Sequence, residues 1–239
     1  MALPSRYKQL LLAGASSLAL AQSALAADKP VTKAPPAVAS WAGPYAGIHL
    51  GAAWHELEFR ELAAPFFFPG VQGASLNQNG FIGGAQAGYN WQAQNYVFGL
   101  EADISWISGS GRTTAVGSGL NSEAFTKMDW LATFRARAGF VVNPLFYVTG
   151  GLAVASVTNT WLEVNGPPSG YRSDKVRTGY VVGVGAEHMY AANRTVRLEL
   201  LYVDLGKVTD QPMLFGDPHY RSEFRNTAVI ARGAFNLKF

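Results

Sequence analysis

The stretch of sequence that decides the fold is Arg232-Gly233-Ala234-Phe235-Asn236-Leu237-Lys238-Phe239. Apolar and polar residues alternate in it with the period of a β-strand, so Phe235, Leu237 and Phe239 fall on one face. The other face carries polar and charged side chains. A strand that has one apolar face and ends in an aromatic residue is typical of transmembrane β-barrels, in which the apolar face contacts lipid.

The first 26 residues have the pattern of a secretory signal peptide. Arg6 and Lys8 precede an apolar run over residues 10–21, and Ala24-Leu25-Ala26 supplies the small residues of a cleavage site. The run is too short for a membrane helix, which needs about 20 apolar residues. We therefore expect residues 1–26 to be removed on export. Residues 27–43, which contain three prolines, are interpreted as an extended periplasmic linker.

The composition excludes several classes of function. Two of the 19 basic residues lie in the signal segment, which leaves 17 basic against 16 acidic residues in the remainder. Such a nearly neutral chain gives no indication of a nucleic-acid partner. The sequence contains no cysteine, which excludes disulfide bonds, thiolate catalysis and cysteine-ligated metals. The 26 glycines and the 14 Phe, 10 Tyr and 6 Trp suit closely packed strands.

Eight segments with the strand period predict a barrel domain over residues 44–239. The expected strands are residues 45–59, 80–92, 96–107, 127–142, 145–157, 177–190, 195–205 and 224–239. The connections between them alternate between long and short. Outer-membrane barrels have an even strand count, short periplasmic turns and long external loops. The sequence therefore predicts an all-β fold, an eight-stranded antiparallel up-and-down transmembrane β-barrel with four external loops and three periplasmic turns.

Aromatic residues on the apolar faces sort into two groups. Beside the long connections lie Trp54, Phe81, Trp106, Trp130, Tyr180 and Tyr202. Beside the short turns lie Trp91, Tyr96, Phe140, Phe146, Tyr190 and Phe239. Mostly small and aliphatic residues separate the two groups. This pattern predicts two aromatic girdles around a lipid-facing band, an arrangement that a soluble β-sandwich has no reason to adopt.

The opposite faces of the strands collect charged residues, which we expect inside the barrel. They are Glu101, Asp103, Asp129, Arg135, Arg137, Glu187, Arg197, Glu199, Arg232 and Lys238. If Phe98 and Phe140 are level, Glu101 lies opposite Arg137 and Asp103 opposite Arg135. Across the next tight turn, Glu187 faces Arg197. Opposite charges directly across a strand pair stabilise it.

These inward charges have two interpretations. They line a conducting channel, or they pair and fill the interior. An eight-stranded barrel is just wide enough for its own side chains, whereas conducting porins use about 16 to 18 strands. Enclosed charges also carry a large cost unless they are paired. We therefore predict a filled, ion-paired interior, with a small-solute pore as the alternative.

Five features of the sequence form a recognisable set: Trp41-Ala-Gly-Pro-Tyr-Ala-Gly, Gly83-Gly-Ala-Gln-Ala-Gly-Tyr-Asn-Trp91, Gly99-Leu-Glu-Ala-Asp103, Thr149-Gly-Gly-Leu-Ala153 and the terminal Phe239. Together they resemble the opacity-type porin family of small outer-membrane β-barrel proteins, and in particular the alphaproteobacterial major outer-membrane proteins. The resemblance implies insertion by the barrel-assembly machinery, which would read the terminal strand containing Gly233, Phe235, Leu237 and Phe239. It also implies an abundant envelope protein exposed to the host or surroundings. Some relatives are called porins or bind haem, and the family has no shared active site.

Two features of the long connections are candidates for ligand contact. Phe66, Phe67 and Phe68 form an aromatic cluster in the first connection, and such a cluster marks a contact with a ligand, with lipopolysaccharide or with the loop itself. His219 and Tyr220 in the fourth are residue types that bind haem iron. His55-Glu56 begins a zinc-protease motif, but residue 59 is Phe, so the second histidine is missing.

The sequence thus predicts a structural, surface-exposed protein of the outer membrane that contributes to envelope integrity and to contacts with the host or surroundings. We expect no catalysis, because a lipid-A-modifying barrel enzyme would need a Ser and His pair at the external rim, and no such pair can be named. No metal site or cofactor is predicted. A small-solute porin and a haem-binding surface protein are the alternatives.

Overall fold

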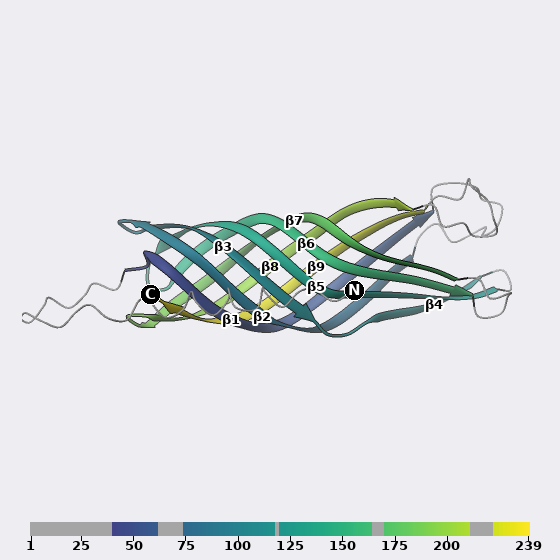
Figure 1. Cartoon of the computed structure of the whole chain (residues 1–239), viewed down its shortest axis with the longest axis horizontal. Helices are drawn as coiled ribbons and strands as arrows, with labels where there is room; N and C mark the ends of the chain where they lie inside the picture. Colours follow the sequence, from purple (N-terminus) through teal and green to yellow (C-terminus); the bar gives the residue numbers. More distant parts are fainter. Residues whose placement is uncertain (1–39, 62–73, 118–119, 164–169, 211–221) are drawn as a thin grey trace, which may run out of the picture. The chain divides into compact units, whose positions relative to one another are not determined.

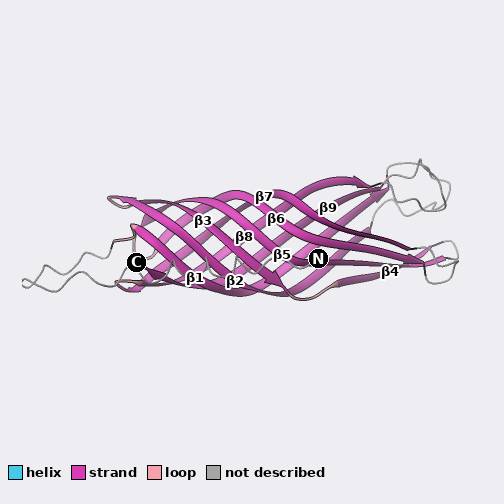
Figure 2. Ribbon diagram, viewed as in Figure 1, coloured by secondary structure: helices cyan, strands magenta, loops and turns pink. Residues whose placement is uncertain are grey.

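The computed structural model describes residues 40–61, 74–117, 120–163, 170–210 and 222–239 (Figure 1). The predicted signal peptide, most of the predicted linker and the loop residues Phe66, Phe67, Phe68, His219 and Tyr220 lie outside these ranges. Within them every regular element is a β-strand (Figure 2). We find in the same ranges no helix with the length and apolar character needed to span a bilayer.

The strands form one antiparallel sheet that closes into a barrel. They are β1 (Gly43–Glu61), β2 (Ala74–Ala93), β3 (Tyr96–Ile107), β4 (Gly111–Gly117), β5 (Leu120–Val141), β6 (Leu145–Glu163), β7 (Gly170–Ala191), β8 (Arg194–Asp210) and β9 (Ser222–Lys238). Their order is β3-β2-β1-β9-β8-β7-β6-β5-β4, and β3 also pairs with β5. Because β4 follows β3 after a short break and pairs with the outer part of β5, it extends the third strand. The predicted eight-stranded barrel is confirmed.

The first and last strands complete the ring. β1 pairs with β9 from Tyr45 opposite Lys238 to Glu61 opposite Ser222. The backbone N–H of Phe239 donates to the carbonyl of Pro44 at 3.0 Å. The start of β1 and the end of β9 therefore lie at the end of the barrel that carries the short turns, which we call the short-turn end. The opposite end is called the long-loop end.

The strands run further toward the long-loop end than the sequence predicts. β5 begins at Leu120 and β7 at Gly170, where the prediction had residues 127 and 177. β4 lies within a connection that was expected to have no strand. Apolar and polar residues do not alternate in these extensions, so the sequence gives no signal of the strand period there. The ladder of backbone hydrogen bonds does not depend on that alternation and continues.

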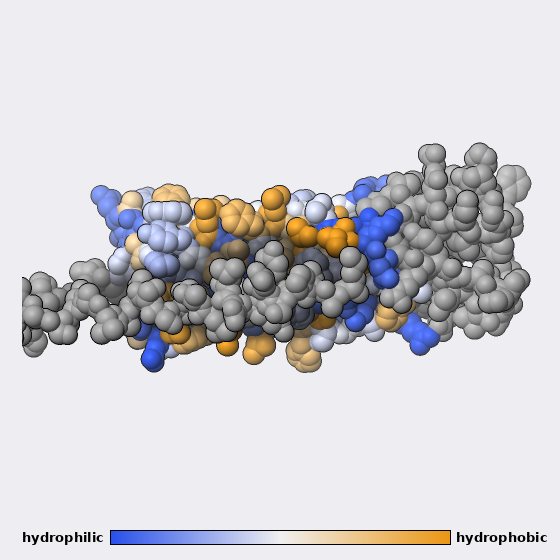
Figure 3. All heavy atoms as spheres, in the orientation of Figure 1, coloured by the Kyte–Doolittle hydropathy of each residue, from blue (hydrophilic) through white to orange (hydrophobic). Residues whose placement is uncertain are grey.

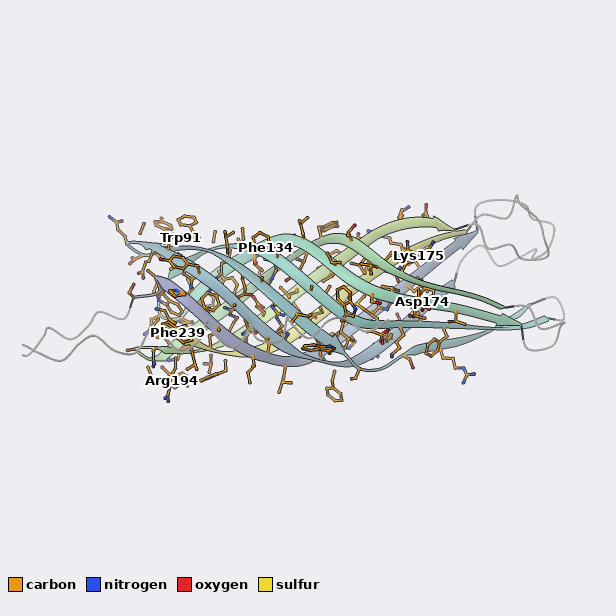
Figure 4. The ribbon with its side chains drawn as sticks, viewed as in Figure 1. Trp91, Phe134, Asp174, Lys175, Arg194 and Phe239 are labelled. Carbon is orange, nitrogen blue, oxygen red and sulfur yellow. The ribbon has the colours of Figure 1, made fainter. Side chains whose placement is uncertain are left out.

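The outer surface of the barrel is apolar between two ends that carry aromatic and polar residues. On the side drawn in Figure 3, hydrophobic side chains gather over the middle and hydrophilic ones toward both ends. Figure 4 places Trp91 and Phe239 at the short-turn end, and Asp174 and Lys175 toward the long-loop end. β3 alternates between exposed and buried residues along its whole length. On β3 the outward face predicted from the sequence is therefore the outward face of the structure.

Candidate functional site

Four arginines and four carboxylates fill the interior nearer the short-turn end, and we call this cluster the ionic layer. Its members are Glu101, Asp103, Arg135, Arg137, Glu187, Arg197, Glu199 and Arg232, and all are buried. They come from inward positions of β3, β5, β7, β8 and β9, so closure of the sheet brings together residues that are distant in sequence. The formal charges of these eight residues balance, and the layer is neutral as a whole.

Arg135 binds three carboxylates. Its guanidinium contacts Glu101, lies 3.0 Å from an oxygen of Asp103 and lies 3.2 Å from an oxygen of Glu199. Each of the other arginines also binds a carboxylate closely. Those pairs are Arg137 with Glu187 at 2.6 Å, Arg197 with Glu101 at 2.5 Å and Arg232 with Glu199 at 2.8 Å. Shared carboxylates join all eight residues into one network.

Two buried tyrosines complete the network, and the sequence analysis missed both. The hydroxyl of Tyr45 donates to Glu101 at 2.6 Å, and that of Tyr147 donates to Glu199 at 2.7 Å. The guanidinium of Arg137 lies 4.2 Å from the centre of the Tyr147 ring, a cation–π contact. Both tyrosines occupy inward positions of their strands, so strand parity was the signal that could have identified them.

The predicted pairing of β3 with its neighbour is wrong by two residues. Glu101 lies opposite Arg135, where the prediction had Arg137, and Asp103 lies opposite Thr133. No short turn connects β3 to β5, because β4 intervenes, so turn length does not fix their register. The long arginine side chains nevertheless reach carboxylates at diagonal positions.

Asp129 lies outside the ionic layer, which corrects the prediction. A β-bulge between Met128 and Trp130 inserts one residue into β5, so the inward positions pass from Met128 to Leu131. The side chain of Asp129 is 41% exposed and pairs with Lys127 at 2.5 Å. Counting every second residue back from the inward-facing Arg135 therefore places Asp129 on the wrong face.

An apolar layer lies next to the ionic layer on the side of the long-loop end. Its members are Ala53, Ile82, Ile107, Met128, Leu131, Ala153, Ala155, Val157, Val181, Leu201, Val203, Leu205, Ala228 and Ile230, all buried. On β8, for example, Leu201 and Val203 follow Glu199 toward the long-loop end. The prediction of an ionic inward face holds for only part of the barrel. The signal was available, because Leu131 shares the parity of Arg135 on β5, and Leu201 and Val203 share that of Glu199 on β8.

A second, smaller apolar cluster closes the short-turn end, and we call it the mouth layer. It consists of Trp41, Val97, Leu145 and Tyr147, with Val141 and Met189 packed against it. Trp41 precedes β1 and lies in the segment predicted to be linker. The ionic layer is thus enclosed between the mouth layer and the apolar layer.

The two histidines of β1 point into the barrel and bind neighbouring side chains. The ring nitrogens of His49 lie 2.7 Å from Gln86 Oε1 and 2.9 Å from Ser105 Oγ. His55 Nε2 lies 3.1 Å from Asn226 Oδ1. Among the residues that the structure describes, no group of three or more His, Cys, Asp or Glu side chains is placed to hold a metal ion.

Comparisons with known proteins place the chain among outer-membrane barrels. The model of the outer membrane protein beta-barrel domain family matches residues 10–227. The 31 kDa outer-membrane immunogenic protein of Brucella melitensis is 37% identical over 214 residues, covering 84% of this chain and 88% of that protein. The 22 kDa outer membrane protein of Rhizobium leguminosarum is 33% identical over 166 residues, covering 68% and 65%.

A solved structure of similar architecture is the outer membrane protein OprG of Pseudomonas aeruginosa, with 12% identity, a TM-score of 0.44 and coverage of 83% of this chain and 97% of that one. The family match and the two relatives carry the assignment. The chain is an outer-membrane protein and belongs to the outer membrane protein beta-barrel domain family.

Proposed function

We propose that the protein is a closed anchor in the outer membrane, which contributes to envelope integrity and presents its long-loop end to the host or surroundings. One observation carries the proposal: the ionic layer is enclosed between two apolar layers. An interior organised in this way is a structural core and not a path for solute.

The width of the barrel and the order of the layers inside it argue against a function as a small-solute porin. An eight-stranded barrel is just wide enough for its own side chains. A solute crossing this barrel would have to displace paired charges and then pass buried aliphatic side chains such as Leu131 and Ile230. Apolar constrictions exclude water and ions. The neutral ionic layer also leaves no excess charge to attract an ion.

The remaining roles follow from this proposal. Lipid and lipopolysaccharide are the proposed surroundings of the barrel, and Gly233, Phe235, Leu237 and Phe239 are proposed to be read by the barrel-assembly machinery. We also propose export by a signal peptide over residues 1–26. Catalysis has no part in the proposal, and haem binding is not favoured by any residue that the structure describes.

The proposal is tested in a strain from which the protein has been deleted. Loss of an abundant anchor should increase sensitivity to detergents and to large antibiotics that the outer membrane normally excludes. The full chain should restore resistance, and so should a chain in which residues 62–73, 164–169 and 211–221 are replaced by short turns, because the anchor resides in the barrel. Equal sensitivity of the parent and the deletion strain would contradict a role in envelope integrity.

A further inference from the structure

The segment before β1 folds across the opening at the short-turn end. Trp41 belongs to no strand, yet its side chain is only 4% exposed and packs with Val97, Leu145 and Tyr147. The chain turns from this segment into β1 at Gly43, whose φ is +114°. A residue with a Cβ atom adopts such a φ only with strain, so glycine is needed where the segment bends.

Side chains, and not a strand ladder, hold this segment in place. The backbone N–H of Trp41 donates to Gln92 Oε1 at 2.7 Å. Nζ of Lys238 on β9 donates to the carbonyl of Ser40, and within the segment the N–H of Ala42 donates to Ser40 Oγ at 3.1 Å. These bonds lie at partly buried or exposed positions, where local opening costs little compared with unfolding of the barrel.

Tyr147 joins the mouth layer to the ionic layer. It belongs to the same buried cluster as Trp41, donates to Glu199 at 2.7 Å and packs against Arg137. The side chain of Arg137 retains only 2% exposure. If the indole were absent, Tyr147 and the charges behind it would face water at the short-turn end. The apolar layer on the far side would remain in place.

We propose that residues 40–42 form a hinged lid, with Trp41 as its seal and Gly43 as its hinge, which governs whether water and small polar solutes reach the ionic layer from the short-turn end. The lid opens and closes without breaking the barrel, because its contacts are those of one side chain and a few hydrogen bonds. Opening hydrates the ionic layer from one side only. The lid is a conformational device distinct from the anchoring role.

The absence of cysteine from the sequence allows a direct test of the lid. Val97 belongs to the mouth layer with Trp41 and is 1% exposed, so Val97→Cys places a single thiol within that layer. The rate at which a sulfonated, membrane-impermeant maleimide labels this thiol reports the open population. Adding Trp41→Ala should raise the rate roughly tenfold or more, because the thiol is then reached without local opening. Trp41→Phe should restore slow labelling in part.

Two controls distinguish opening of the lid from a general loosening of the barrel. Trp54→Ala, at the long-loop end, should leave the labelling rate of Val97→Cys unchanged. Gly43→Ala adds a Cβ atom at a residue whose φ is +114°, which strains the bend of the segment, and it should increase the rate by an intermediate factor even if Trp41→Ala does not fold. Folding of each variant is checked by its heat-dependent gel shift. The lid is refuted if folded Trp41→Ala and Gly43→Ala variants label no faster than Val97→Cys alone, or if Val97→Cys alone labels as fast as a thiol at exposed Asn95.

Discussion

Replacing Arg135 by methionine should destabilise the folded barrel by about 3–5 kcal/mol, because it leaves buried carboxylates without their shared cation. The side chain of Arg135 has no exposed surface and binds Glu101, Asp103 and Glu199. Methionine has a similar length but cannot donate a hydrogen bond. The variant would therefore leave the ionic layer with one more negative than positive charge in an enclosed space.

Urea unfolding in lipid vesicles measures this loss, with the folded fraction read from the heat-dependent gel shift. Lys127→Met on the same strand is the matched control, because it removes a cation from a salt bridge whose side chains are 43% and 41% exposed. Exposed pairs contribute about 0–1 kcal/mol. Equal losses in the two variants would show that the ionic layer does not hold the barrel together.

Replacing Leu201 by alanine should cost about 2–5 kcal/mol, because it leaves a cavity in the apolar layer. Leu201 is 1% exposed and lies on the inward face of β8. Truncation removes the apolar contacts of the side chain and leaves the interior of the barrel less completely filled. The same unfolding titration measures the loss, so this variant compares directly with Arg135→Met.

Leu198 on the same strand supplies the control for this substitution. Its side chain is 72% exposed on the outward face, where lipid fills the space left by truncation. Leu198→Ala should therefore change stability much less than Leu201→Ala. If the outward substitution cost as much as the inward one, the apolar layer would not be a packed core.

The sequence identified the fold because a barrel strand has only two faces. The alternation at Phe235, Leu237 and Phe239 extends through the eight predicted strands and, except at the bulge in β5, predicts which residues face outward. The position of Glu187 opposite Arg197 was also predicted correctly, because a short turn connects β7 to β8 and sets their register. Where a short turn sets the register of two strands, the sequence alone is enough to predict which residues lie opposite each other.

The errors arise where pairing depends on structure that has no local signal. The bulge after Met128 reverses the parity that placed Asp129 inside the barrel. The register of β3 against β5 depends on how β4 leaves and rejoins the sheet. The prediction of an ionic interior does not include the apolar layer, although Leu131 and Leu201 share the parity of Arg135 and Glu199.

Single-channel conductance of the folded protein in a planar bilayer tests the closed interior most directly. The enclosed ionic layer and the apolar layer predict that a protein whose folding is confirmed by its gel shift produces no resolved current steps, even in concentrated salt. Regular steps whose size increases with salt concentration would contradict the account, because they would show a continuous water path through the barrel.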